Sequence, residues 1–135
     1  MFELEIDAKL SNLEEVLDFV NRHLKKVNCP EKTRVQVDIA VEEIFVNIAH
    51  YAYNPEVGKA TIRVELSEKP LTISLTFMDN GKPYDPLSKK DPDVTLNAEQ
   101  RQIGGLGIYM VKKSMDDIQY SYKNGTNMLT FKKKL

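Results

Sequence analysis

Two polar side chains one helical turn apart could act on a phosphate group. Glu43 and Asn47 are four residues apart in a segment of helical periodicity, so both lie on the same face of the helix. A carboxylate there can orient or deprotonate an attacking hydroxyl, and an amide oxygen can join the coordination shell of a magnesium ion. The same face can equally be the solvent side of an ordinary helix, and spacing alone leaves both interpretations open. The neighbouring Glu42 points about 100° away and is the weaker candidate.

A further acidic residue follows an apolar strand. Asp79, Asn80 and Gly81 come directly after the apolar segment 71–78 and immediately before a long loop. This tripeptide is common in ordinary turns. A carboxylate at a strand end can also accept a hydrogen bond from an exocyclic amine such as that of adenine, and Gly81 would let the backbone pass close to a flat ring.

A glycine-rich segment opens a helix later in the chain. The sequence Gly-Gly-Leu-Gly at 104–107 leads into an apolar run that is expected to be helical to about Met115. Such glycines serve either a tight turn or a backbone that approaches phosphate, where bare N–H groups and the positive end of the helix dipole bind negative charge. The spacing excludes a Walker loop, because no Gly-Lys-Ser/Thr follows, and it lacks the Gly-x-Gly-x-x-Gly order of a dinucleotide fold.

Hydrophobic periodicity predicts the strands that position these residues. Apolar and polar side chains alternate with a period of two, which is typical of half-buried strands, in five segments: 2–8, 61–66, 71–78, 118–123 and 127–133. The second and third segments form one hairpin through residues 67–70, and the last two form another through Asn124 and Gly125.

Apolar residues at helical spacing predict helices over residues 11–28, 33–54 and about 106–115. Ser11 and Glu14 are expected to form a capping box at the first of these. Residues 86–103 show no periodicity, and a loop of this length in a small domain is usually functional or disordered, so we interpret it as a lid. This order of elements predicts an α+β fold, a two-layer α/β sandwich whose mixed sheet is covered on one face by helices.

Length and composition predict one domain, residues 1–135. The chain is long enough for a single sizeable core, and its net charge of −1 gives no general attraction to nucleic acid or to an anionic membrane. The N-terminus lacks the basic and apolar parts of a signal peptide, and no stretch approaches the ~20 apolar residues of a membrane span. We therefore expect a cytoplasmic protein with no direct nucleic-acid or membrane partner.

The motifs, taken in order, resemble the three boxes of the GHKL (Bergerat) ATP-binding fold. They are Glu43-x-x-x-Asn47, then Asp79-x-Gly81, then Gly-Gly-Leu-Gly at 104–107, with a long loop before the last. More narrowly, EEIFVNIAHYAY, DNGKPYDP and the segment from GGLGIYMV to the end look like the bacterial anti-sigma-factor serine/threonine kinases. The resemblance spans nearly the whole chain, including the order of its elements.

The resemblance implies ATP and Mg²⁺ as cofactors and a role for each motif residue. Glu43 would be the general base and Asn47 the magnesium ligand, while Asp79, with Gly81 beside it, would accept the hydrogen bond of adenine. The residues expected at the phosphates are Arg101, Gly104, Gly105, Leu106 and Gly107.

The resemblance also bears on the last predicted hairpin and on the end of the second predicted helix. Thr126 and Thr130 in the last hairpin would make water-bridged contacts to the base. The family often has a basic or histidine residue four places after the asparagine, where this chain has Tyr51 and carries His50 one position earlier. His23 is predicted to be a surface histidine of the first helix.

The resemblance implies an enzyme that transfers the γ-phosphate of ATP to a serine or threonine of a small anti-sigma antagonist protein and also binds a sigma factor. It further suggests a homodimer. The alternative is a non-catalytic binding module of the same fold, in which ATP only selects the partner. A histidine-kinase catalytic domain is disfavoured, because DNGKPY lacks the second glycine of that family's Asp-x-Gly-x-Gly box.

Overall fold

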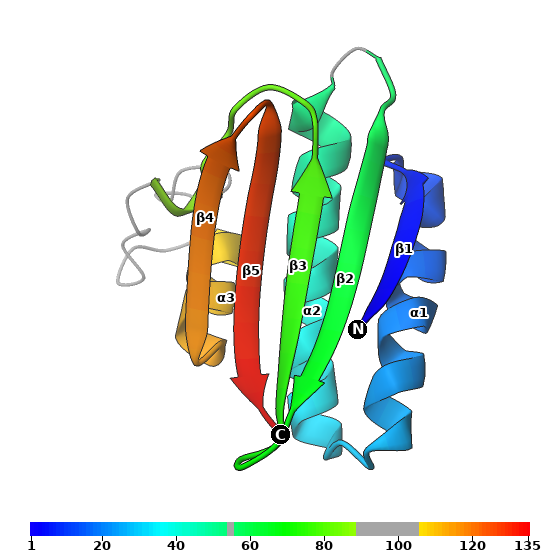
Figure 1. Cartoon of the computed structure of the whole chain (residues 1–135), viewed down its shortest axis with the longest axis vertical. Coiled ribbons are helices and arrows are strands. Elements are labelled where there is room, and N and C mark those ends of the chain that lie inside the picture. The colour runs from blue at the N-terminus through cyan, green and yellow to red at the C-terminus, as the bar shows by residue number, and fades with distance from the viewer. Residues whose placement is uncertain (54–55, 89–105) are drawn as a thin grey trace, which may run out of the picture.

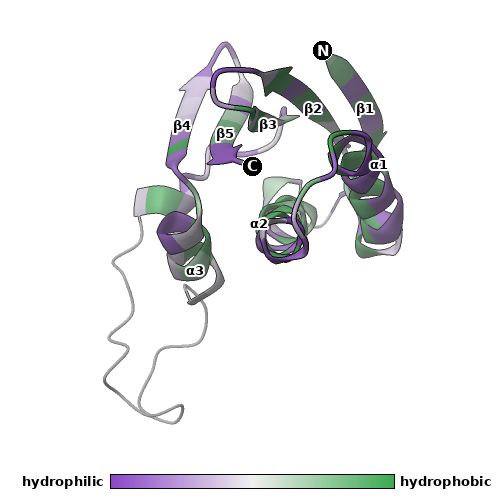
Figure 2. Ribbon diagram, turned by 90° about the horizontal axis from the view of Figure 1, so that it is seen from below, coloured by the Kyte–Doolittle hydropathy of each residue, from purple (hydrophilic) through white to green (hydrophobic). Residues whose placement is uncertain are grey.

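The computed structural model describes residues 1–53, 56–88 and 106–135. In this part of the chain a five-stranded sheet forms one layer and three α-helices form the other (Figure 1). Seen from the end of the molecule, the helices all lie on the same side of the sheet (Figure 2). The predicted two-layer α/β sandwich is therefore confirmed.

The sheet has the order β1-β2-β3-β5-β4. Its strands are β1 (Phe2–Asp7), β2 (Lys59–Ser67), β3 (Thr72–Asp79), β4 (Asp117–Lys123) and β5 (Thr126–Lys134). Each neighbouring pair in this order is antiparallel, so the sheet differs from the mixed sheet expected. Short turns join β2 to β3 and β4 to β5, and a short turn allows only antiparallel pairing.

Alternation along the strands separates a buried face from an open one. The side chains of β2, β3 and β5 that face the helices form most of the sheet's share of the core: Ile62, Val64, Leu75, Phe77, Leu129 and Phe131. Between them, polar side chains such as Arg63 and Thr130 point to the other face. A side chain of β5 therefore reaches the helix side only if it is in step with Leu129 and Phe131.

The first helix, α1 (Leu13–Lys26), lies beneath the β1 edge of the sheet (Figure 2). The expected capping box does not form: a 3-10 turn precedes the helix, Asn12 is the N-cap, and its Nδ2 donates to the carbonyl of Asp7 at 2.9 Å. The prediction of a surface histidine at position 23 is also wrong. His23 lies on the buried stripe of α1, with its ring 4.4 Å from that of Phe2 and 5.1 Å from that of Phe19.

The second helix, α2 (Glu31–Asn47), runs beneath the centre of the sheet and carries the first motif. It begins two residues before the predicted start and continues as a π-helical turn, Ile48–Ala52. The short α3 (Leu106–Ser114) lies beside it. No helix in the described residues is long and apolar enough to span a membrane.

Candidate functional site

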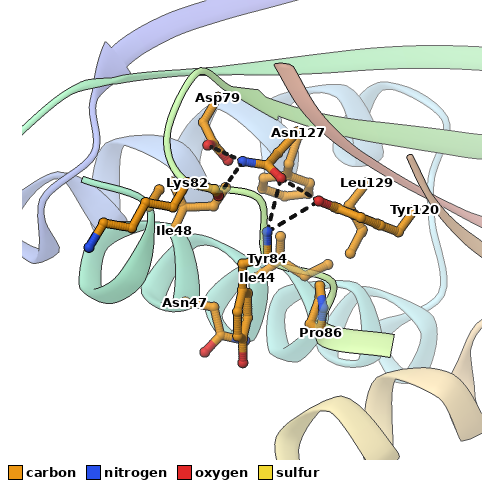
Figure 3. Close-up of a pocket in the computed structure, with 12 residues that line it drawn as sticks. Ile44, Asn47, Ile48, Asp79, Lys82, Tyr84, Pro86, Tyr120, Asn127 and Leu129 are labelled. Carbon is orange, nitrogen blue, oxygen red and sulfur yellow. Dashed lines mark hydrogen bonds between the residues drawn. The ribbon is translucent and has the colours of Figure 1, made fainter. Parts of the chain in front are cut away.

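A pocket lies between α2 and the sheet, at the end where β3 finishes (Figure 3). Its apolar wall consists of Ile44, Ile48, Ala52, Phe77, Pro86 and Leu129. Its polar groups come from Asn47, Asp79, Lys82, Tyr84, Tyr120 and Asn127. An apolar cavity with a few convergent polar groups is the usual form of a small-molecule site.

The carboxylate of Asp79 is the buried acidic group of this pocket. Asp79 is only 7% exposed, and its Oδ1 accepts hydrogen bonds from the backbone N–H of Gly81 and from Nδ2 of Asn127, both at 2.9 Å. Burial raises the pKa of the Asp79 carboxyl, and these two hydrogen bonds oppose the rise. No donor among the described residues reaches Oδ2, so this oxygen can accept a hydrogen bond from a ligand.

Asn127 is a pocket residue that the sequence reasoning missed. It is 5% exposed, and its Nδ2 also donates to the carbonyl of Lys82 at 2.8 Å. Its Oδ1 accepts from the backbone N–H of Tyr84 at 3.2 Å and from the hydroxyl of Tyr120. β5 therefore places a buried amide at the back of the pocket. Both the nitrogen and the oxygen of this amide already make hydrogen bonds within the protein.

The two threonines expected near the base do not line this pocket. Thr130 lies on the open face of the sheet, where its hydroxyl is 3.0 Å from that of Thr76, and Thr126 donates to Asn80 Oδ1 at 3.0 Å. Strand alternation explains this placement, because Asn127 is in step with buried Leu129 whereas the threonines are not. An asparagine in step with apolar core positions was the signal that could have identified it.

Gly81 allows the backbone after β3 to approach the backbone of Ala52 closely. A Cβ added there would lie 2.2 Å from the carbonyl oxygen of Ala52, and the next N–H, that of Lys82, donates to the same oxygen at 2.8 Å. The loop after β3 is thus fastened to the π-helical turn Ile48–Ala52. Such turns are rare and are found frequently at functional sites.

Glu43 and Asn47 form a second polar group beside the pocket. Nδ2 of Asn47 lies 3.4 Å from Oε1 of Glu43, a long hydrogen bond, and both side chains are half-buried. A Cβ on Gly107 would lie 2.2 Å from Oε2 of Glu43, so only glycine lets the first turn of α3 rest on this carboxylate. Glu42, the weaker candidate, is exposed.

Several predicted positions lie outside the described residues. They are Arg101, Gly104, Gly105 and residues 89–103 of the predicted lid. The first residues of that lid, Pro86–Ser88, form a 3-10 turn, and Leu106 begins α3. Tyr51 occupies the position where the family often has a basic or histidine residue. Its ring stacks on that of Tyr84, with the centroids 5.3 Å apart.

The oxygen of Asn47 fits a magnesium ion that is shared with a phosphate ligand. In the described part of the chain, no group of three or more His, Cys, Asp or Glu side chains could hold a metal. Asn47 directs its Nδ2 at Glu43, and its Oδ1 accepts no hydrogen bond from a described residue. Mg²⁺ commonly takes one or two protein oxygens and completes its shell with waters and substrate phosphates.

Comparisons with known proteins show the family of this chain. Residues 6–133 match the histidine kinase-like ATPase domain. The serine/threonine-protein kinase BtrW of Bordetella bronchiseptica is 24% identical over 127 residues, which are 94% of this chain and 89% of the relative. The serine-protein kinases RsbW of Bacillus cereus and Listeria monocytogenes are 36% and 31% identical over 70% of this chain.

The matched regions are 60% and 62% of the two RsbW proteins, so the chain spans about three-fifths of these relatives. The crystal structure of the RsbU and RsbW domains of a Mycobacterium tuberculosis protein superposes with a TM-score of 0.68 at 14% identity, over 100% of this chain and 33% of that one, which supports the fold. The chain thus belongs to the family of histidine kinase-like ATPase domains, the GHKL fold that its motifs resemble.

Proposed function

We propose that this chain is an ATP-dependent serine/threonine kinase that phosphorylates a small anti-sigma antagonist protein and also binds a sigma factor. The names of its relatives support the kinase activity. The observation that carries the proposal is that the pocket, the Glu43–Asn47 pair and the start of α3 form one continuous site. Asn47 lines the pocket of Asp79 and also contacts Glu43, whose carboxylate lies against the first turn of α3 at Gly107.

The pocket suits a flat ring with an amino group on one edge. Ile44, Ile48 and Leu129 offer apolar surface, and Oδ2 of Asp79, which accepts no hydrogen bond from a described residue, offers one acceptor. A site built to hydrogen-bond one group of a ligand discriminates strongly against a ligand that lacks it. Adenine has this shape and this donor, whereas guanine presents a carbonyl at the same position.

Asn47 lines the pocket and contacts Glu43, and in the proposal the phosphates of a bound nucleotide extend toward these two side chains. Phosphoryl transfer depends mainly on positioning and charge stabilisation. In the proposed step, Glu43 accepts the proton of a serine or threonine hydroxyl while that oxygen bonds to the γ-phosphorus and the bond to the ADP oxygen breaks. Asn47 would hold Mg²⁺ through Oδ1, and the ion supplies charge neutralisation to the phosphates when bound.

The test compares two adjacent carboxylates of α2. Glu43→Gln removes the proposed base with almost no change of shape, and Glu42→Gln removes the same charge from an exposed side chain. Calorimetry measures Mg-ATP binding, and labelled ATP measures transfer to a candidate antagonist protein. We expect Glu43→Gln to bind as the parent does and to transfer about 10²–10⁴-fold more slowly, whereas Glu42→Gln retains both properties.

The possible outcomes separate the components of the proposal. Unchanged transfer in Glu43→Gln would remove Glu43 from the role of general base. A parent that binds Mg-ATP but phosphorylates no antagonist protein would favour the non-catalytic binding module. A parent that binds no ATP would overturn the proposed function altogether.

A further inference from the structure

The hydrogen-bond network around Asn127 joins the acidic group of the pocket to the loop that follows β3 (Figure 3). We infer that Asn127 is a positioning residue for purine selectivity: it holds Asp79 with one carboxylate oxygen occupied and the other presented to a purine amino group. This inference rests on the proposed ATP binding and adds to it a residue that acts through Asp79.

Sheet register brings the two side chains together. Asp79 on β3 and Asn127 on β5 are directly opposite each other in the antiparallel pair. Opposed residues have their Cβ atoms only about 5 Å apart on the same face, and here the two side chains meet in a hydrogen bond of 2.9 Å. Both residues are buried. The contact is thus fixed by the sheet rather than by a surface rotamer.

The orientation of the Asn127 amide is determined by its neighbours. Its Oδ1 faces two donors, the N–H of Tyr84 and the hydroxyl of Tyr120. Its Nδ2 faces two acceptors, Oδ1 of Asp79 and the carbonyl of Lys82. A flipped amide would set donors against donors and acceptors against acceptors in a buried place, where unsatisfied polar groups are costly. The amide is therefore locked with its donor toward the carboxylate.

The fixed orientation of the Asn127 amide determines which carboxylate oxygen of Asp79 a ligand can contact. Oδ1 already accepts two hydrogen bonds, from Asn127 and from the backbone N–H of Gly81. Oδ2, which accepts from no residue that the structure describes, is left as the acceptor in the pocket. Burial raises the pKa of the Asp79 carboxyl and the hydrogen bond from Asn127 lowers it, so Asn127 also favours the ionised form that can accept from an amine.

The experiment measures discrimination for a single amino group. The probes are ATP and purine riboside triphosphate, which lacks the 6-amino group, and calorimetry gives the Kd of each in the presence of Mg²⁺. The variants are Asn127→Asp, which replaces the donor by an acceptor at nearly constant shape, and Tyr120→Phe, which removes the hydroxyl that orients the amide. The control is Thr76→Val, which removes the hydrogen bond between buried Thr76 and Thr130 on the face of the sheet away from the helices.

We expect the parent and Thr76→Val to prefer ATP by about 10- to 100-fold, the usual worth of a hydrogen bond to a charged group. Asn127→Asp is expected to lose most of that preference, and Tyr120→Phe part of it. Thermal melting identifies a variant that does not fold. Should Asn127→Asp be unfolded, a lowered preference in folded Tyr120→Phe supports the inference, and an unchanged preference there overturns it.

Failure of the inference can be distinguished from failure of the proposed function. A parent that binds neither nucleotide overturns the proposed function. A parent that prefers ATP, with the same preference in folded Asn127→Asp, overturns only the inference. Equal weakening of both nucleotides in that variant also overturns it, because a purely structural role would lower affinity without changing the ratio.

Discussion

Substituting Gly107 tests whether the position of the Glu43 carboxylate matters to the chemistry. A Cβ at this position would lie 2.2 Å from Oε2, 2.3 Å from Cδ and 2.7 Å from Oε1 of Glu43. Real Cβ atoms essentially never approach another heavy atom within 3.0 Å. In Gly107→Ala, either the helix or the carboxylate must therefore move.

The carboxylate is the part that moves, because it is the far end of a flexible side chain. Glu43 would retreat by roughly 1 Å, and a misplacement of that size can cost about 10²-fold in rate. The fold should tolerate the change. Alanine is favoured over glycine in a helix by up to about 1 kcal/mol, which offsets part of the cost of the displacement, so we expect the free energy of unfolding to change by no more than about 1 kcal/mol.

Gly125 provides the matched control. It lies in the turn between β4 and β5 with a φ of +77°, and a Cβ there would meet nothing within 4 Å. Gly125→Ala should lower the free energy of unfolding by about 1 kcal/mol, because alanine is strained in this left-handed conformation, and it should leave phosphate transfer unchanged. Neither alanine is thus expected to change the free energy of unfolding by much more than about 1 kcal/mol in a denaturant melt, whereas only Gly107→Ala should slow transfer from labelled ATP.

A Gly107→Ala variant that transfers phosphate as fast as the parent would contradict this prediction. That result would mean that the carboxylate position given by the first turn of α3 is irrelevant to the reaction. A loss of several kcal/mol in unfolding free energy would also contradict it, because the helix rather than the side chain would then have moved.

Three further predictions concern stability. Gly81→Ala should destabilise the fold by about 1–3 kcal/mol, because the added Cβ would meet the backbone of Ala52, which cannot give way; an unchanged denaturant midpoint would contradict this. Burial raises the pKa of Asp79, so the folded state binds its proton more tightly and stability falls as pH rises above 3.8; in Asp79→Asn this dependence should disappear from melts at acidic pH. Burial lowers the pKa of His23, with nearby cations adding to the effect, so stability should fall as pH drops below 6.5, and melts of His23→Phe should lack that fall.

Local periodicity was sufficient to predict the elements and the motif positions on them. The strand found at Lys59–Ser67 contains the predicted segment 61–66, and the turn at Asn124 and Gly125 forms as expected, with positive φ at both residues. The strand β3 delivers Asp79 to a pocket at its end. These features depend on a few adjacent residues, because side-chain alternation and turn conformation are set by local backbone geometry.

The sequence by itself determined which residues share a helix face or end a strand, but only the tertiary structure decided which of them meet. Asn127 faces Asp79 because β3 and β5 pair in one register, although 48 residues separate them. Gly107 rests on Glu43 because α3 docks against α2, and His23 is buried because β1 supplies Phe2 to cover it. Register and docking arise from packing between distant segments, and a local pattern contains no information on that packing.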